Sequence, residues 1–199
     1  NLRNTSFQVG SIITTTGFMT VDFDQWPSLS RYVLLFLMMI GACAGSTGGG
    51  MKVSRFLLSV KSALRELNSY LFPKSVKKIK MDGKTVDEEA IRGINVYFTA
   101  YILLVVLSVF LICINGMDIE SAFSSVLGTF NNIGPGLGKF GPTCNFGWVS
   151  TFSKYVYIFD MLAGRLELFP VLILLYPPSW RGLLKRSMKR KKNKRATTI

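Results

Sequence analysis

Long runs of apolar residues alternate with short polar segments along this chain of 199 residues. Residues 93–117 provide 25 consecutive positions without a charged side chain, and residues 32–51 provide 20 more. About 20 apolar residues in a helix cross the ~30 Å hydrocarbon core of a bilayer. We therefore predict membrane spans over residues 31–56, 93–115 and 155–176, and an all-α membrane protein as the fold class.

Two further stretches, residues 7–24 and 118–147, are too short or too rich in glycine to cross a bilayer. Each starts with a modestly amphipathic run, residues 7–13 and 119–130, and then becomes rich in Gly, Thr and Asn. A short helix followed by irregular backbone is tolerated at membrane depth only where that backbone is buried or lines a water-filled cavity. This pattern predicts two re-entrant pore loops.

The predicted elements form a weak internal repeat. Gly17 and Gly134 are 117 residues apart, and Gly45 and Gly164 are 119 residues apart, so superposing one pair nearly superposes the other. From this repeat we predict helix–pore loop–helix units, of which the first is incomplete. The predicted parts are a first pore loop and broken inner span (residues 1–72), a cytoplasmic connector (73–92), a complete span–loop–span unit (93–178) and a basic cytoplasmic tail (179–199).

Charge is confined to two blocks, although the whole chain has 24 basic and 11 acidic residues and a net charge of +13. Residues 52–92 have a net charge of +5 and residues 181–195 a net charge of +9. Loops rich in Lys and Arg stay on the cytoplasmic side, so we place both blocks there, near anionic lipid. The tail could instead bind phosphates of a nucleic acid. Its position directly after an apolar span favours membrane lipid and no nucleic acid.

The composition also excludes several classes of enzyme. The chain has no histidine, and its three cysteines lack the spacing of metal ligands. Histidine-based catalysis, a histidine-ligated metal and an imidazole switch are thereby removed. We expect no enzymatic activity and no covalently bound cofactor.

Glycine-punctuated ends of the two pore loops carry the candidate chemistry. They read Thr-Thr-Thr-Gly-Phe (residues 14–18) and Asn-Asn-Ile-Gly-Pro-Gly (residues 131–136). A cation filter replaces the hydration shell with backbone carbonyl oxygens, and glycine adopts the required backbone angles without strain. Two ordinary glycine turns at the outer surface remain the alternative. The predicted filter residues are Thr15, Thr16, Gly17, Phe18, Asn132, Ile133, Gly134 and Pro135.

A second glycine-rich stretch interrupts the inner half of the first span, at residues 41–52. Three consecutive glycines, each about 1 kcal/mol worse than alanine in a helix, predict a broken helix whose backbone faces a cavity. The spacing of Gly41, Gly45 and Gly49 also fits close helix packing. Met51 separates the glycines from Lys52, so the phosphate-binding P-loop pattern fails.

The last span contains three charged residues, Asp160, Arg165 and Glu167. An arginine at the bilayer centre costs ~2.5–3.5 kcal/mol even on the lenient insertion scale, so charges there are functional candidates. On one continuous helix, at roughly 100° per residue, Asp160, Gly164 and Glu167 share a face and Arg165 does not. We predict that Arg165 projects into a permeation path while Glu167 holds neighbouring backbone. The alternative is a tilted helix whose charges reach outward to water.

Together these motifs resemble the C-terminal half of the Trk/Ktr/HKT potassium transporter superfamily, and most closely its bacterial TrkH members. The resemblance implies four pseudo-symmetric repeats around one pore, with one filter glycine each. The chain would supply the third repeat without its first helix, and the complete fourth repeat. Gly49 and Met51 depart from the alanine and the aliphatic residue common in the family. The implied gate comprises Gly45, Ser46, Thr47, Gly48, Gly49, Gly50 and Lys52, with Arg165 and Glu167.

By resemblance, the expected function is potassium uptake across the cytoplasmic (inner) membrane by a multi-pass protein, with K⁺ as the transported ion. The expected partners are the N-terminal half of the same transporter, a second copy in a homodimer and a cytosolic nucleotide-binding regulatory ring. Three alternatives remain. The chain could be a non-transporting scaffold with glycine-mediated helix packing, a sodium-translocating member of the superfamily, or a two-span channel subunit that forms tetramers.

Overall fold

The computed structural model describes residues 2–41, 45–46, 48–72, 78–166, 168–176 and 178. These residues are mostly helical, in agreement with the predicted fold class. The helices are α1 (Leu2–Ile13), α2 (Ser28–Met39), α3 (Val53–Leu71), α4 (Glu88–Cys113), α5 (Ile119–Phe130), α6 (Thr151–Arg165) and α7 (Leu168–Leu175). The strands are β1 (Ile40–Gly41), β2 (Met51–Lys52), β3 (Lys80–Met81) and β4 (Lys84–Thr85).

Helix α4 confirms the helix predicted over residues 93–115, and it begins a little earlier. Its 26 residues extend about 39 Å, and an 18-residue window has a mean hydropathy of 2.6. Among the described helices, α4 is the one long and apolar enough to cross a membrane by itself. Only 28% of that window is buried, so most of this apolar surface faces outward, unlike the core helix of a soluble protein.

The first predicted span is broken, as its glycines indicate. Helix α2 ends at Met39, and helical structure resumes only at Val53. Between the two helices, β1 and β2 pair in parallel, with Ile40 opposite Met51 and Gly41 opposite Lys52. The pairing joins the two ends of the intervening glycine-rich segment. Thr47, a predicted gate residue, lies outside the described residues.

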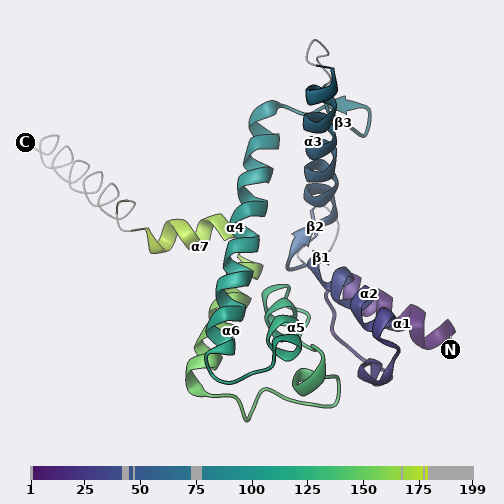
Figure 1. Cartoon of the computed structure of the whole chain (residues 1–199), viewed down its shortest axis with the longest axis vertical. Coiled ribbons are helices and arrows are strands. Elements are labelled where there is room, and N and C mark those ends of the chain that lie inside the picture. Colours follow the sequence, from purple (N-terminus) through teal and green to yellow (C-terminus); the bar gives the residue numbers. More distant parts are fainter. Residues whose placement is uncertain are drawn as a thin grey trace, which may run out of the picture.

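The last predicted span, residues 155–176, is two helices rather than one. Helix α6 ends at Arg165 and α7 begins at Leu168. Figure 1 shows α7 running across the direction of α4 rather than along it. Pro170 explains the break, because proline has no N–H to give the carbonyl four residues earlier and its ring clashes with that carbonyl, here Leu166. In the first turn of α7 the missing N–H costs nothing, since it would have no partner within the helix.

The connector between α3 and α4 contains a tight turn at Asp82-Gly83. Both residues have positive φ, 50° and 78°, and they join the antiparallel strands β3 and β4. This pair of positive angles is the two-residue hairpin turn that matches the twist of the strands. A small apolar cluster of Leu58, Ile79 and Ile91 packs the hairpin against α3 and α4. The basic tail, from residue 179 onward, lies outside the described residues.

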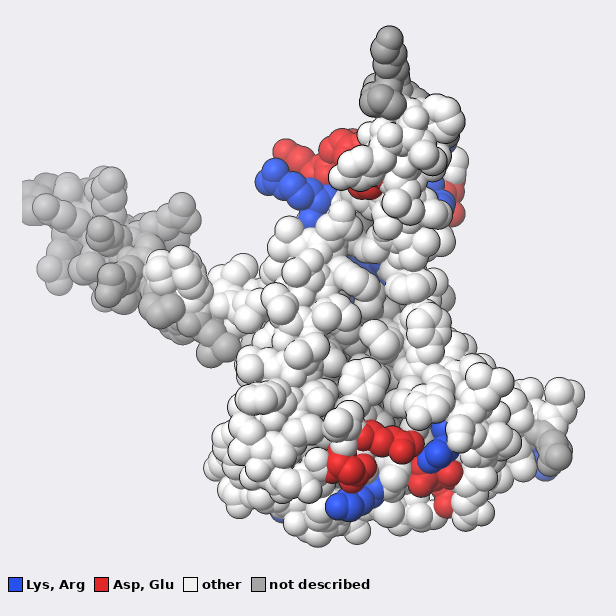
Figure 2. All heavy atoms as spheres, viewed as in Figure 1, with Lys and Arg blue, Asp and Glu red and all other residues white. Residues whose placement is uncertain are grey.

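Charged side chains gather at two ends of the visible face and leave an almost uncharged belt between them (Figure 2). One end holds the start of α4, where Arg65 pairs with Glu88. The other holds the start of α5 and the loops around it, where Arg31 pairs with Glu120. Since α4 connects these ends, the belt has the length that a bilayer core requires.

Candidate functional site

The first pore loop (residues 14–18, loop 1) and the second (residues 131–135, loop 2) follow helices of the same length. Both α1 and α5 have 12 residues, and α5 begins and ends 117 positions after α1. At the helix ends the backbone hydrogen bonds repeat with this same offset. They are Thr14 N to Gly10 O and Asn131 N to Leu127 O, Thr15 N to Ile12 O and Asn132 N to Thr129 O, and Thr16 N to Ser11 O and Ile133 N to Gly128 O.

Left-handed backbone occurs at matching positions of the two loops. Thr15 and Asn132 have φ of 54° and 55°, and Gly17 and Gly134 have φ of 78° and 104°. Only glycine adopts such angles without a steric penalty, and a β-branched threonine is an outlier there. Both loops therefore turn the chain in the same way, with the glycine two residues after the first left-handed position.

The two loops touch each other. A Cβ atom built on Gly17 would lie 1.9 Å from the carbonyl oxygen of Ile133 and 3.5 Å from Cδ of Pro135. No side chain fits at Gly17, because the group it would meet is backbone. Segments more than a hundred residues apart in sequence thus meet at the two predicted filter glycines.

The carbonyl oxygens of the loops fall into two groups. Within the described part of the chain, none of the oxygens of residues 15–17 and 132–134 accepts a hydrogen bond. By contrast, the Phe18 carbonyl accepts one from Ser11 Oγ at 2.6 Å. In loop 2, the carbonyl oxygens of Pro135 and Gly134 lie 2.9 Å and 3.1 Å from a Cβ built on Gly128 of α5. Of the predicted filter residues, Phe18, Gly134 and Pro135 therefore direct their oxygens back toward their own helix.

The segment between β1 and β2 (residues 42–50, the glycine loop) meets loop 2 through its described residues Gly49 and Gly50. A Cβ on Gly49 would lie 2.5 Å from the Asn131 carbonyl oxygen, and one on Gly50 would lie 2.3 Å from Asn131 Oδ1. Gly45 has open space around it. Gly48 donates its N–H to Ser46 Oγ at 3.1 Å, and Lys52 is the last residue of β2. The structure thus brings Gly49 and Gly50, two of the predicted gate residues, against the base of loop 2.

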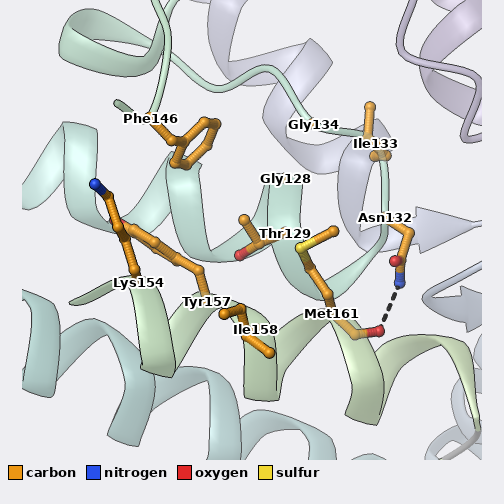
Figure 3. A pocket seen from close by; sticks show the side chains of 10 residues that line it. All are labelled: Gly128, Thr129, Asn132, Ile133, Gly134, Phe146, Lys154, Tyr157, Ile158 and Met161. Atoms are coloured by element: carbon orange, nitrogen blue, oxygen red, sulfur yellow. Dashed lines mark hydrogen bonds between the residues drawn. The ribbon is translucent and has the colours of Figure 1, made fainter. Parts of the chain in front are cut away.

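Helix α6 supports loop 2 from the other side. A Cβ on Gly164 would lie 1.6 Å from the Phe130 carbonyl oxygen, so backbone packs directly against backbone. Asn132 Nδ2 donates to the Met161 carbonyl at 3.1 Å, the bond drawn in Figure 3. Arg165 is exposed and ends α6. Asp160 and Gly164, which were predicted to share a helix face, both lie on α6, whereas Glu167 lies outside the described residues.

Several supporting residues were missed by the sequence-based prediction. Tyr101, fully buried on α4, donates to Asn131 Oδ1 at 3.1 Å and meets the Phe130 ring edge-on at 5.0 Å. Ser125 and Tyr157 join α5 to α6 through their hydroxyl groups at 2.9 Å. Polar residues within otherwise apolar helices were the available signal, because each buried polar group needs a partner.

Ion pairs connect the elements at the end of the molecule where α5 begins. Arg31 Nη1 lies 3.3 Å from Asp24 Oδ1 and 3.2 Å from Glu120 Oε1, and Asp24 Oδ1 also accepts from Gly138 N. This network joins the segment after loop 1 to α5 and to the segment after loop 2. Asp118 caps α5 by accepting from Ser121 N at 3.0 Å. That backbone hydrogen bond holds the pKa of the Asp118 carboxyl below its usual range.

A pocket of about 570 Å³ opens beside loop 2 (Figure 3). Asn132, Ile133 and Gly134 form one side, and α6 forms the facing side with Lys154, Tyr157, Ile158 and Met161. Lys154 donates to the Gly147 carbonyl at 2.8 Å. Among the described residues, no cluster of acidic or cysteine side chains could hold a metal ion. The oxygens near a cation here would come from the backbone and from the side chains of Thr129, Asn132 and Tyr157.

Known proteins of similar sequence identify the family of this chain. The family described as TrkH, cation transport protein, matches residues 1–180. The chain belongs to the TrkH family. The Trk system potassium uptake protein TrkH of Vibrio parahaemolyticus is 46% identical over 176 residues, which are 88% of this chain and 36% of that protein. The TrkH of Escherichia coli K12 is 42% identical over 175 residues, again 88% of this chain and 36% of the relative.

Three-dimensional similarity extends over the same region. The crystal structure of the potassium transporter TrkH from Vibrio parahaemolyticus superposes with a TM-score of 0.79 at 45% identity, covering 87% of this chain and 37% of that one. This TrkH-family chain therefore spans little more than a third of the length of the relatives it matches. Its membrane-protein fold follows from the family, since the relatives are transporters.

Proposed function

We propose that this TrkH-family chain forms part of a potassium uptake pathway across the cytoplasmic membrane, and that it acts as a transporter rather than an enzyme. The names of its relatives, Trk system potassium uptake proteins, support the substrate. The observation that carries the proposal is the contact between Gly17 and the Ile133 carbonyl. It joins two loops that share the same pattern of backbone hydrogen bonds and positive φ angles.

In this proposal the two loops are two quarters of a filter. The unpaired carbonyl oxygens of residues 15–17, 132 and 133 replace part of the hydration shell of K⁺. Phe18, Gly134 and Pro135 belong to the filter as residues that close each turn, since their carbonyls face back to the helix. Two quarters do not close a ring, so the N-terminal half of the same transporter would supply the others.

The gate is the glycine loop together with Arg165. Gly49 and Gly50 lie against Asn131, directly below the filter residues, so movement of this loop changes the path under the filter. The charge of Arg165 repels a cation, and repulsion strengthens where little water screens it. The membrane potential drives uptake with about 2.3 kcal/mol per charge for each 100 mV. Thr47 and Glu167 complete the proposed gate.

The proposed arrangement is multi-pass, with both basic blocks in the cytoplasm. Helices α2 and α3 form one broken span, α4 forms the second, and α6 with α7 forms the third. A second copy of the transporter, a cytosolic nucleotide-binding ring and anionic lipid are the proposed partners. The basic connector and tail offer positive charge for the ring or the lipid.

Substitution of the filter glycines in the complete transporter tests the proposal. Gly17→Ala introduces both a clash with Ile133 and a strained φ, whereas Gly134→Ala introduces strained φ into open space. Gly10→Ala is the matched control, because a Cβ built on this helical glycine would meet no atom of the described residues within 4 Å. In proteoliposomes, we expect Gly17→Ala and Gly134→Ala to reduce the ratio of K⁺ to Na⁺ flux while Gly10→Ala keeps it. An unchanged ratio in well-folded Gly17→Ala protein contradicts a filter at these loops, and a wild type that prefers Na⁺ contradicts the potassium assignment.

Arg165→Ala tests the gate. Removal of a positive charge from the permeation path should raise cation flux through the complete transporter. Unchanged flux together with lost expression would instead support a packing role, as in a scaffold subunit that does not transport.

A further inference from the structure

A buried carboxyl group, that of Asp160, lies between α4 and α6. It directly precedes Met161, whose carbonyl accepts the hydrogen bond from Asn132 of loop 2. Asp160 has no exposed surface. Its Oδ1 accepts a hydrogen bond from Ser108 Oγ on α4 at 2.7 Å. Its Oδ2 is equally buried and has no hydrogen-bond partner among the residues that the structure describes. One of the two oxygens of this acid is therefore buried without a hydrogen-bond donor among the described residues.

No described cation compensates a charge at this position. Helix α7 contains no charged residue, and the charged residue of α5 is Glu120 at its outer end. The charged residues of α4 are Glu88, Glu89 and Arg92, all in its first two turns and far along the helix from Ser108. The remaining titratable groups of α4 are Tyr97, Tyr101 and Cys113.

On α6 itself, Lys154 is held by the Gly147 carbonyl at the outer end. Arg165 is five residues beyond Asp160, on another face of the helix and exposed. The other titratable groups of α6 are Tyr155 and Tyr157. A carboxylate with one oxygen unpaired and no cation beside it is strongly disfavoured in such a site, and the group neutralises instead.

We infer that Asp160 is a proton-binding site inside the membrane domain, and that in its protonated form it joins α6 to α4. The neutral acid keeps its carbonyl oxygen for Ser108 and places no net charge between the helices. The next residue, Met161, accepts the hydrogen bond from Asn132, and Gly164 packs on Phe130. Loss of the proton would place an uncompensated charge between α4 and α6, and hydration of that charge would loosen the segment of α6 that supports loop 2. This last step rests on the proposed function, whereas the proton site does not.

Infrared spectroscopy of the complete transporter tests the proton site directly. We expect wild-type protein at neutral pH to show the carbonyl band of a protonated carboxylic acid, and Asp160→Asn to lack it. Ser108→Ala should shift the band without removing it, because the hydrogen bond to the acid is lost, and this assigns the band even if Asp160→Asn folds poorly. Asp82→Asn, in an exposed turn, should leave the band unchanged. Absence of the band from folded wild-type protein at neutral pH overturns the inference.

The pH profile of potassium flux tests the consequence for loop 2. Above the pH at which the infrared band loses half of its intensity, wild-type flux should fall by up to tenfold per pH unit, as expected for one linked proton. Asp160→Asn should not show this fall. An identical alkaline fall in wild type and Asp160→Asn overturns the positioning role of Asp160. A wild type with the band but without K⁺ flux at any pH contradicts the proposed function and supports the proton site alone.

Discussion

Alanine at Gly164 should damage the protein far more than alanine at any exposed helical glycine. The added Cβ would lie 1.6 Å from the Phe130 carbonyl oxygen, 2.8 Å from its carbonyl carbon and 3.2 Å from Asn132 Nδ2. The closest two atoms are backbone, so no side-chain rotation relieves the clash. To restore an ordinary contact distance, α6 and the end of α5 must separate by about 2 Å.

The cost follows from what such a separation breaks. Overpacking of a well-packed core typically costs 1–3 kcal/mol and occasionally more. A shift of about 2 Å also breaks the 3.1 Å bond between Asn132 and the Met161 carbonyl, worth about 1 kcal/mol. Alanine improves an exposed helix by about 1 kcal/mol, which offsets part of this. We expect a net loss of about 1–3 kcal/mol of stability.

Gly93→Ala is the control, since this glycine of α4 has nothing within 4 Å. We would measure thermal unfolding of the complete transporter in detergent by size-exclusion chromatography. Gly164→Ala should lower the unfolding temperature relative to wild type, and Gly93→Ala should leave it unchanged. Potassium flux per folded Gly164→Ala molecule should also fall, because loop 2 loses its support. Equal stability and flux in the two variants would refute the close backbone packing of α5 and α6.

Two further substitutions test the surroundings of the loops. Tyr101→Phe removes the hydroxyl that donates to Asn131 and leaves a buried amide oxygen without a partner, so thermal unfolding should show a loss of about 1–3 kcal/mol; no loss would mean that Asn131 finds another partner. Asp118→Ala removes the cap of α5 and should cost about 1 kcal/mol at neutral pH. Since the pKa of Asp118 is lowered on folding, its carboxylate stabilises the protein above its ordinary pKa of 3.8 and this stabilisation is lost as the pH falls below it. Unfolding measured between pH 6 and pH 3 should therefore show the wild type approaching Asp118→Ala, and a constant difference would contradict the assignment.

Hydrophobic pattern and glycine content predicted the main helices well. The uninterrupted apolar run gave α4, and residues 119–130 became α5 with the same bounds. The three consecutive glycines correctly indicated that the first span is broken. These features are local, since each depends on residues close together in sequence.

The features that sequence reasoning missed are mostly long-range. The contact of Gly17 with Ile133 joins positions over a hundred residues apart, and no periodicity specifies it. The partner of Asn131, Tyr101, resembles any aromatic residue of an apolar helix until the fold places its hydroxyl. The break between α6 and α7 is different, because it has a local signal. Pro170 disfavours a continuous helix, but the apolar run around it is long enough to predict a single span.

The short parallel pairing of β1 with β2 has a mechanical consequence for the segment it encloses. Two hydrogen-bonded strands hold their chains about 4.8 Å apart, so both ends of the enclosed segment are pinned to one point. The pairing therefore fixes the end of α2 relative to the start of α3, whatever course the backbone takes between the two strands.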